Sequence, residues 1–244
     1  MRVAVISDIH GFSIALDHVL ADIAAVPGID CVVAAGDLAE GGPDPAGVVD
    51  RIRDAGIRSV QGNTDRDLAS GVRNSTPARW VSRQLGKERL AWLGGLPFEL
   101  RLSPPGASNP GDDLLVVHAN PQDMDRHLDP GFSDDQVREF LGETQAAVVA
   151  FGHLHVAYQR TVGCVKLIDV SAVGNPKDED LRSKWGLISW DESTGQWQTE
   201  LRYVAYPLDQ TVEQLKAVAY PNWRKAAKKL ERASYKAASS WQPA

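Results

Sequence analysis

The sequence predicts an α/β fold, because short apolar runs alternate with segments of helical periodicity. We expect four runs to form strands that are covered on both faces, and these runs are residues 3–7, 31–35, 114–117 and 146–151. Residues 59–61 form a weaker candidate strand. Apolar residues recur at helical spacing from Leu16 to Ile23, and Asp44 and Pro45 begin a second helical segment with proline in the favoured first position. Strands and helices that alternate in this way indicate parallel strands near the N-terminus.

The second half of the chain has a different pattern. Residues 165–206 contain strand-like segments separated by turn signals, and residues 211–238 have a helical pattern interrupted at Pro221. The sequence shows no internal repeat and no composition shift typical of a linker. We therefore expect one domain over residues 1–208 and a C-terminal helical extension over residues 209–244 that packs on the same domain.

The composition narrows the class of protein. The chain has 244 residues, of which 43% are hydrophobic and 24% charged, as in ordinary globular proteins. Its formal net charge of −6 disfavours a general nucleic-acid-binding surface, although a metal centre could still create a positive site for an anion. No apolar stretch approaches the length of a membrane span.

The expected location is cytoplasmic. A carboxylate at position 8 interrupts the N-terminus before a signal peptide could form. Cys31 and Cys164 are isolated in apolar surroundings, so we expect both to be small buried side chains in a reducing compartment.

Metal-binding residue types directly follow five of the strand-like runs. The five clusters are Asp8-Ile9-His10, Gly36-Asp37, Gly62-Asn63, His118 and Gly152-His153-Leu154-His155. In open α/β sheets, ligands bind just beyond the carboxyl ends of the strands, so these side chains are expected to converge. Residues two apart on an extended segment share one face, so both side chains of the Asp-x-His and His-x-His pairs should reach the same centre. The glycines should allow sharp turns and close backbone approach.

The candidate ligands are four imidazoles, two carboxylates and one amide oxygen. This set suits Mn, Fe or Zn rather than calcium, and it contains no thiolate of the kind found in structural zinc sites. Seven ligands are too many for one tetrahedral ion but match two divalent ions that share a bridging carboxylate. Because Asp8 and Asp37 cancel only two of about four positive charges, a phosphate fits such a centre. Manganese is the ion that we expect to support activity in vitro.

Together the five clusters resemble the signature of the calcineurin-like metallophosphoesterases. That signature runs D-x-H, G-D, G-N-H-[DE], an isolated His and G-H-x-H, and all five blocks occur in order over residues 8–155, with one departure. The resemblance implies a four-layer α/β sandwich of two mixed β-sheets flanked by helices. It also implies that one metal is held by Asp8, His10, Asp37 and His155. The second metal would be held by Asn63, His118 and His153, with Asp37 as the bridge.

The departure is Thr64, which occupies a position where many members of the family have histidine. That histidine is usually credited with protonating the leaving group, which a threonine cannot do as an imidazolium does. The departure resembles a bacterial and archaeal subgroup with Cys or Thr at this position, several of which resemble phosphodiesterases. We therefore expect a phosphoesterase in which a metal-bridging hydroxide attacks a phosphodiester or phosphoanhydride, in preference to an alkyl monoester.

Three residues near the motifs, His127, Asp65 and Arg66, are candidates for further roles. His127 could replace the missing acid or could be an exposed loop histidine. Asp65 could orient a neighbour or a water, but a helix cap is the favoured alternative. Arg66 could clamp a phosphate together with Asn63 and Thr64, or it could form a surface salt bridge.

Two wider alternatives stay open. The basic segment 222–236 could dock a nucleotide or a nucleic-acid phosphate backbone, or it could be a solvated helix face, which we favour. The chain as a whole could be a non-catalytic interaction module that retains the fold. The expected partner is a phosphorylated small molecule or nucleotide; nucleic acid is not favoured, and apolar β-rich edges leave a homodimer open.

Overall fold

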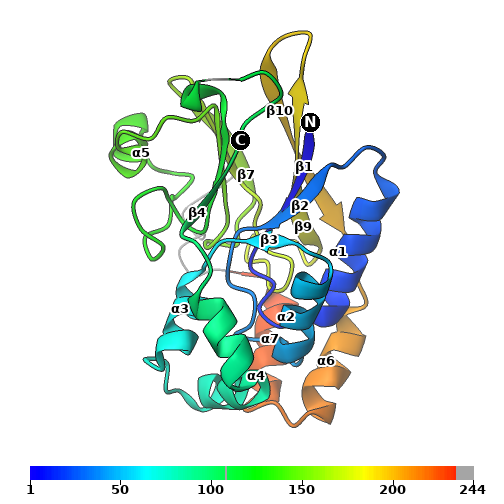
Figure 1. Ribbon diagram of the computed structural model, residues 1–244. Coiled ribbons are helices and arrows are strands. Elements are labelled where there is room, and N and C mark those ends of the chain that lie inside the picture. The colour runs from blue at the N-terminus through cyan, green and yellow to red at the C-terminus, as the bar shows by residue number, and fades with distance from the viewer. Residues whose placement is uncertain (108, 235–244) are drawn as a thin grey trace.

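The computed structural model describes residues 1–107 and 109–234, which form two five-stranded sheets (Figure 1). The first sheet has the order β10-β9-β1-β2-β3, and the second has the order β4-β5-β6-β8-β7. In the first sheet the strands are β1 (Arg2–Ile6), β2 (Cys31–Ala34), β3 (Arg58–Ser59), β9 (Ser183–Asp191) and β10 (Gln196–Val204). In the second they are β4 (Glu99–Leu102), β5 (Leu114–Val117), β6 (Val148–Phe151), β7 (Tyr158–Val162) and β8 (Val165–Asp169).

Both sheets are mixed, which confirms the predicted class of fold. In the first sheet β1 pairs in parallel with β2 but antiparallel with β9. In the second sheet β5, β6 and β8 are parallel, while β4 and β7 pair antiparallel at the two edges. The helices in the described part of the chain are α1 (Ser13–Ala25), α2 (Pro45–Asp54), α3 (Asn63–Ser70), α4 (Thr76–Gly94), α5 (Asp134–Leu141), α6 (Leu208–Ala217) and α7 (Trp223–Arg232).

The apolar strands are buried on both faces, and this arrangement produces four layers. In β1, Ala4 and Ile6 pack against the helices, whereas Val3 belongs to the core between the two sheets. In β5, Leu114 faces the core between the sheets and Leu115 packs on the outer side with residues of α5. Figure 1 shows α5 beside the second sheet, while α1, α2, α6 and α7 lie on the side of the first sheet.

Most of the sequence-based elements are present at or near the expected positions. Asp44 is the N-cap of α2 and accepts a hydrogen bond from the Gly47 amide at 3.0 Å, with Pro45 first in the helix. The prediction that both cysteines are buried is wrong. Cys31 is only half-buried, and Cys164, in the tight β7–β8 turn, is exposed. No helix in residues 1–107 and 109–234 has the length and apolarity needed to cross a membrane.

The C-terminal extension packs against the core that covers the first sheet. Leu215, Tyr220 and Leu230 are buried in the same apolar cluster as the residues of α1 and α2. The helical pattern is interrupted near Pro221, as the sequence indicated, and α6 and α7 are separate helices. Residues 235–244, which include the last part of the basic segment, lie outside the described residues.

Candidate metal centre

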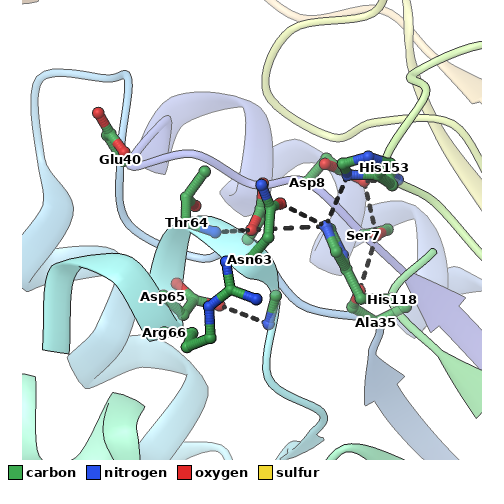
Figure 2. A network of polar contacts seen from close by, with 12 residues as sticks. Ser7, Asp8, Ala35, Glu40, Asn63, Thr64, Asp65, Arg66, His118 and His153 are labelled. Carbon is green, nitrogen blue, oxygen red and sulfur yellow. Dashed lines mark hydrogen bonds and ion pairs between the residues drawn. The ribbon is translucent and has the colours of Figure 1, made fainter. Parts of the chain in front are cut away.

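The structure brings all seven predicted ligands together at one edge of the two sheets. They lie at the ends of four strands and the start of one helix, namely β1, β2, β5, β6 and α3. Asp8 and His10 follow β1, and Asp37 follows β2. These first-sheet residues meet His118 and His153, which follow strands of the second sheet, so the centre lies where the two sheets meet (Figure 2).

The backbone at the ligands is left-handed rather than extended. The non-glycine residues with positive φ include five of the ligands, with φ between 51° and 71°: Asp8, His10, Asp37, His153 and His155. The sequence argument from an extended segment was therefore wrong in its reason, although both members of each pair do reach the centre. Each such residue costs about 1 kcal/mol or more, and strain of this kind clusters at functional sites. Backbone bonds hold the turn, because the Asp8 and His10 amides donate to the Gly36 and Asp37 carbonyls.

Two glycines allow the loops to approach this closely. A Cβ atom on Gly62 would overlap with Asp37, and one on Gly152 would overlap with the side chains of Ser7 and Asp8. Gly62 directly precedes Asn63, and Gly152 directly precedes His153. Packing therefore requires a residue without a side chain before each of these candidate ligands, as predicted.

Hydrogen bonds fix which nitrogen of each histidine faces the centre. Each ring places its other nitrogen against a backbone carbonyl, and a carbonyl can only accept, so that nitrogen carries the hydrogen. The four pairs are His10 Nδ1 with Glu40 at 2.6 Å, His118 Nδ1 with Ala35 at 2.8 Å, His153 Nε2 with Asp125 at 2.9 Å, and His155 Nδ1 with Asn175 at 2.6 Å. In each neutral ring the remaining nitrogen presents a lone pair to the centre.

When both rings are neutral, the inward-facing atoms of the first group are all acceptors. His10 Nε2 lies 3.1 Å from His155 Nε2, and Asp8 Oδ1 lies 3.4 Å and 3.0 Å from these two atoms. No hydrogen-bond donor of the described residues reaches Asp8 Oδ1, which is fully buried. Lone pairs gathered this closely repel one another, and a cation between them would remove the repulsion. The donor set therefore fits a divalent metal ion.

A second group has the same character. His118 Nε2 lies 3.1 Å from Asn63 Oδ1 and 3.1 Å from His153 Nδ1 (Figure 2). Asp37 lies between the two groups, because its Oδ1 is 3.5 Å from His118 Nε2 and its Oδ2 is 3.7 Å from His10 Nε2. A carboxylate that offers one oxygen to each group has the geometry of a bridging ligand.

The charge states differ between the histidine rings. Against the effect of burial, the carboxylates of Asp8 and Asp37 raise the pKa of His10 and the pKa of His118, so a bound cation would take the place of protons on these two rings. Burial lowers the pKa of His155 to about 4, and burial together with the nearby His118 lowers the pKa of His153, so both rings are neutral at pH 7. Burial opposes ionisation of Asp8, but His155 and His10 hold the pKa of this carboxyl well below its ordinary value. The pKa of Asp37 is lowered by His118 and His10, again against the effect of burial.

Ser7 orients Asp8, and sequence reasoning did not identify it. The buried Ser7 hydroxyl donates to Asp8 Oδ2 at 2.7 Å, and the His153 amide donates to the same oxygen at 2.8 Å (Figure 2). Asp8 Oδ1 is left for the centre. As the residue directly after a buried strand, Ser7 could have been noticed only by its polarity in an apolar run.

Comparison with known proteins agrees with this geometry. Residues 1–157 match the sequence profile of the calcineurin-like phosphoesterases. The chain belongs to this family. Its described Asp and His side chains include two groups able to hold a metal ion, Asp8 with His10 and His155, and Asp8 with Asp37 and His118.

Some similar proteins cover more of the chain than the family match does. An uncharacterized protein of Methanocaldococcus jannaschii is 25% identical over 245 aligned residues, which cover 91% of this chain and 94% of that protein. A symmetrical bis(5′-nucleosyl)-tetraphosphatase of Acidovorax is 30% identical over 157 residues, 61% of this chain, and the chain spans about half of its length (52%). The crystal structure of a metallophosphoesterase from Sphaerobacter thermophilus has the same fold, with a TM-score of 0.75, 22% identity and coverage of 96% of this chain and 99% of the other.

Thr64 and Asp65 support this centre from the first turn of α3. The Thr64 amide donates to Asp37 Oδ1 at 2.9 Å, and its buried hydroxyl has no partner among the described residues. The fully buried Asp65 carboxylate accepts from the Leu38 amide at 3.0 Å and the Gly62 amide at 3.2 Å. Asp65 therefore caps α3 and ties it to the loop that carries Asp37.

Arg66 and His127 lie close to the centre but differ in their surroundings. Arg66 pairs with Asp67 at 2.7 Å and with Asp125 at 2.9 Å, so its guanidinium already binds two carboxylates. The ring centroid of His127 lies 6.3 Å from that of His153, and its Nε2 is 4.0 Å from a carboxylate oxygen of Asp129.

A cavity of about 340 Å³ lies next to the centre. Besides ligands, its walls carry Arg73, Lys177, Lys229 and Tyr220, which no motif indicated as site residues. Lys229 belongs to the basic segment noted in the sequence, whereas nothing in the local sequence pattern marks Arg73 or Lys177.

Proposed function

We propose that this chain is a phosphoesterase that uses two divalent cations, Mn, Fe or Zn, to hydrolyse a phosphodiester or a phosphoanhydride. The proposal rests above all on the Nε2 atoms of His10 and His155, which lie 3.1 Å apart beside Asp8 Oδ1 and which, in neutral rings, point their lone pairs at one another. Buried acceptors that face one another without a donor are costly, and bound cations would remove that cost.

The contacts among the candidate ligands suggest which of them would hold each cation. Asp8, His10, Asp37 and His155 would hold the first ion, and Asn63, His118, His153 and Asp37 would hold the second. When bound, two such ions activate a water as nucleophile and stabilise charge on the phosphoryl oxygens. The protein orients the ligands through Ser7 and through the four carbonyls that hold the histidine rings.

Two observations support a diester or an anhydride as substrate. Thr64 lines the cavity where an acidic histidine would help an alkoxide to leave, and a phosphate leaving group needs such help less. The Acidovorax relative is named for a bis-nucleosyl tetraphosphate, a compound whose phosphates are joined by anhydride bonds. For substrates that still need a proton, we propose His127 as the donor because of its position beside His153.

The test combines metal analysis with a comparison of substrates. The purified chain should bind two ions, measured by elemental analysis. With added Mn²⁺ it should hydrolyse bis-p-nitrophenyl phosphate faster than p-nitrophenyl phosphate. Asp37→Ala is the matched inactive variant, because Asp37 contacts both ligand groups.

Two outcomes would change the proposal. Bound metal without turnover of any phosphoester would support the alternative of a non-catalytic interaction module that retains the fold, which the Thr64 substitution favours. Faster hydrolysis of the monoester would show that the inference from Thr64 is wrong.

A further inference from the structure

The C-terminal helix α7 forms part of the wall of the cavity at the metal centre. Ala226, Lys229 and Leu230 of α7 line the cavity, together with Tyr220 from the preceding turn. Leu230 and Tyr220 are buried in the main core, so the position of the helix is fixed by packing. The cavity therefore extends from the metal ligands to a part of the chain that lies outside the matched residues 1–157.

Lys177 places a second cation on the same wall, close to the centre. Its backbone amide donates to the carbonyl of His155 at 2.9 Å, so this lysine is attached to the loop that carries a metal ligand. Lys177 and Lys229 both line the cavity next to the centre. Partial desolvation and the neighbouring Lys225 lower the pKa of Lys229.

Besides the two lysines and the candidate ligands, the charged side chains that line the cavity are Arg73 and Glu40. Arg73 pairs with Glu40 at 3.2 Å and with Asp67 at 3.4 Å. Lys229 forms no ion pair within 4.0 Å with a described residue, although Glu40 acts on it at longer range. Lys177 is half-buried whereas Lys229 is exposed, so an anion bound at Lys177 would be screened less by solvent than one at an open surface.

We propose that Lys177 and Lys229 form a second anion subsite, which binds a phosphate linked to the one held at the metal centre. This inference rests on the proposed function and narrows it. A simple diester carries one anionic phosphate and leaves the second subsite empty, whereas a phosphoanhydride carries a second phosphate directly next to the first. The preferred substrate class is then a small molecule with a chain of linked phosphates, such as a nucleoside polyphosphate.

The kinetic test compares two substrates of the Mn²⁺-loaded full chain. The measured quantity is kcat/KM for diadenosine tetraphosphate divided by kcat/KM for bis-p-nitrophenyl phosphate. Lys177→Met and Lys229→Met should each lower this ratio by about tenfold, the usual effect of losing one charge-assisted hydrogen bond. Lys228→Met is the matched control, because Lys228 is exposed on α7 as Lys229 is but does not line the cavity; its ratio should equal that of the wild type.

A binding measurement separates this inference from the proposed function. Calorimetry on the metal-free chain compares inorganic tripolyphosphate with inorganic phosphate. The wild type should prefer tripolyphosphate, and both cavity variants should lose about tenfold of that preference. If neither substrate is turned over, the proposed function fails, and a lysine-dependent preference for tripolyphosphate would still support the subsite.

Three results would overturn the subsite itself. The first is a substrate ratio and a tripolyphosphate preference that are the same in all variants. The second is an equal loss on both substrates with a native circular-dichroism spectrum, which would indicate general damage to the cavity. The third is a Lys229-dependent preference for a single-stranded oligonucleotide over tripolyphosphate, which would assign the wall to nucleic acid instead.

Discussion

His10 and His155 face each other through Nε2 atoms 3.1 Å apart, although each ring already donates its Nδ1–H to a backbone carbonyl. The carbonyls belong to Glu40 and Asn175, on two different loops, so the two rings are fixed independently. Their opposition is therefore built into the fold. Replacing either ring should therefore have a large effect on the affinity for metal.

His155→Ala should weaken metal binding strongly. The variant loses a nitrogen ligand, and we expect the Mn²⁺ dissociation constant to rise by more than about 100-fold, beyond the effect of changing an outer-shell partner. Mn²⁺ should also raise the Tm of the wild type but shift that of the variant much less. His18→Ala is the control, because His18 is exposed on α1 and its ring Nδ1 lies against the Ile14 carbonyl, one turn earlier in the same helix. Equal metal content in both variants and the wild type would contradict the assignment.

Asp65→Ala should destabilise the chain more than its neighbour Asp67→Ala. The substitution removes the acceptor for two buried amides, those of Leu38 and Gly62, and we expect a loss of about 2–4 kcal/mol in the free energy of unfolding. Asp67 forms partly exposed ion pairs with Arg66 and Arg73, and its loss should cost about 1 kcal/mol or less. Urea unfolding measures both. Similar losses in the two variants would refute the capping role of Asp65.

Thr64→His should improve hydrolysis of monoesters with poor leaving groups. Thr64 lines the cavity, its buried hydroxyl has no partner among the described residues, and an imidazole at this position could protonate the departing oxygen. We expect kcat for phenyl phosphate to rise by about tenfold or more relative to p-nitrophenyl phosphate, whose leaving group needs no proton. If both rates rise or fall together, the substitution acts on something other than leaving-group protonation.

His127→Gln should have the opposite selectivity. If His127 donates the proton, its removal should lower kcat for poor leaving groups by about tenfold or more and have a smaller effect on p-nitrophenyl esters. The metal content must stay equal to that of the wild type, since His127 is close to the ligand His153. An equal loss on all esters would assign His127 to support of His153 instead.

The fold and the convergence of the candidate ligands could be predicted because their signals are local. Apolar runs such as 114–117 are strands buried on both faces, and each ligand follows a strand or begins a helix. The route by which Asp8 and His10 reach the centre was not predictable, because left-handed backbone at non-glycine residues has no reliable sequence signal. The same holds for Cys164, whose exposure follows from its place in a tight turn rather than from its apolar neighbours.

The cavity wall could not be predicted, because it depends on tertiary packing. The basic run around Lys229 was noticed, but its pattern is equally typical of a solvated helix face. Only the packing of Leu230 and Tyr220 into the core brings that helix to the metal centre. Lys177 has no surrounding motif, and it reaches the cavity through the backbone bond between its amide and His155.

Asp169→Asn should change how stability depends on pH. Asp169 is fully buried at the end of β8; its Oδ1 accepts from the Ser171 amide at 2.7 Å, and no described donor reaches Oδ2. Burial raises the pKa of this carboxyl well above its ordinary value, so the folded chain holds the proton more tightly than the unfolded chain. Stability from this group is complete below the unfolded pKa of about 4 and is lost as the pH rises towards the folded pKa.

Asparagine keeps the shape and the Oδ1 acceptor but cannot ionise, so the variant should escape this loss. In EDTA, which removes any contribution from metal, the free energy of unfolding of the variant minus that of the wild type should become more positive between about pH 5 and about pH 8. The absolute difference at one pH would be hard to interpret, because the amide hydrogens of asparagine also need partners. The change with pH isolates the carboxyl, and a difference that is constant across this range would show that Asp169 is ionised in the folded chain.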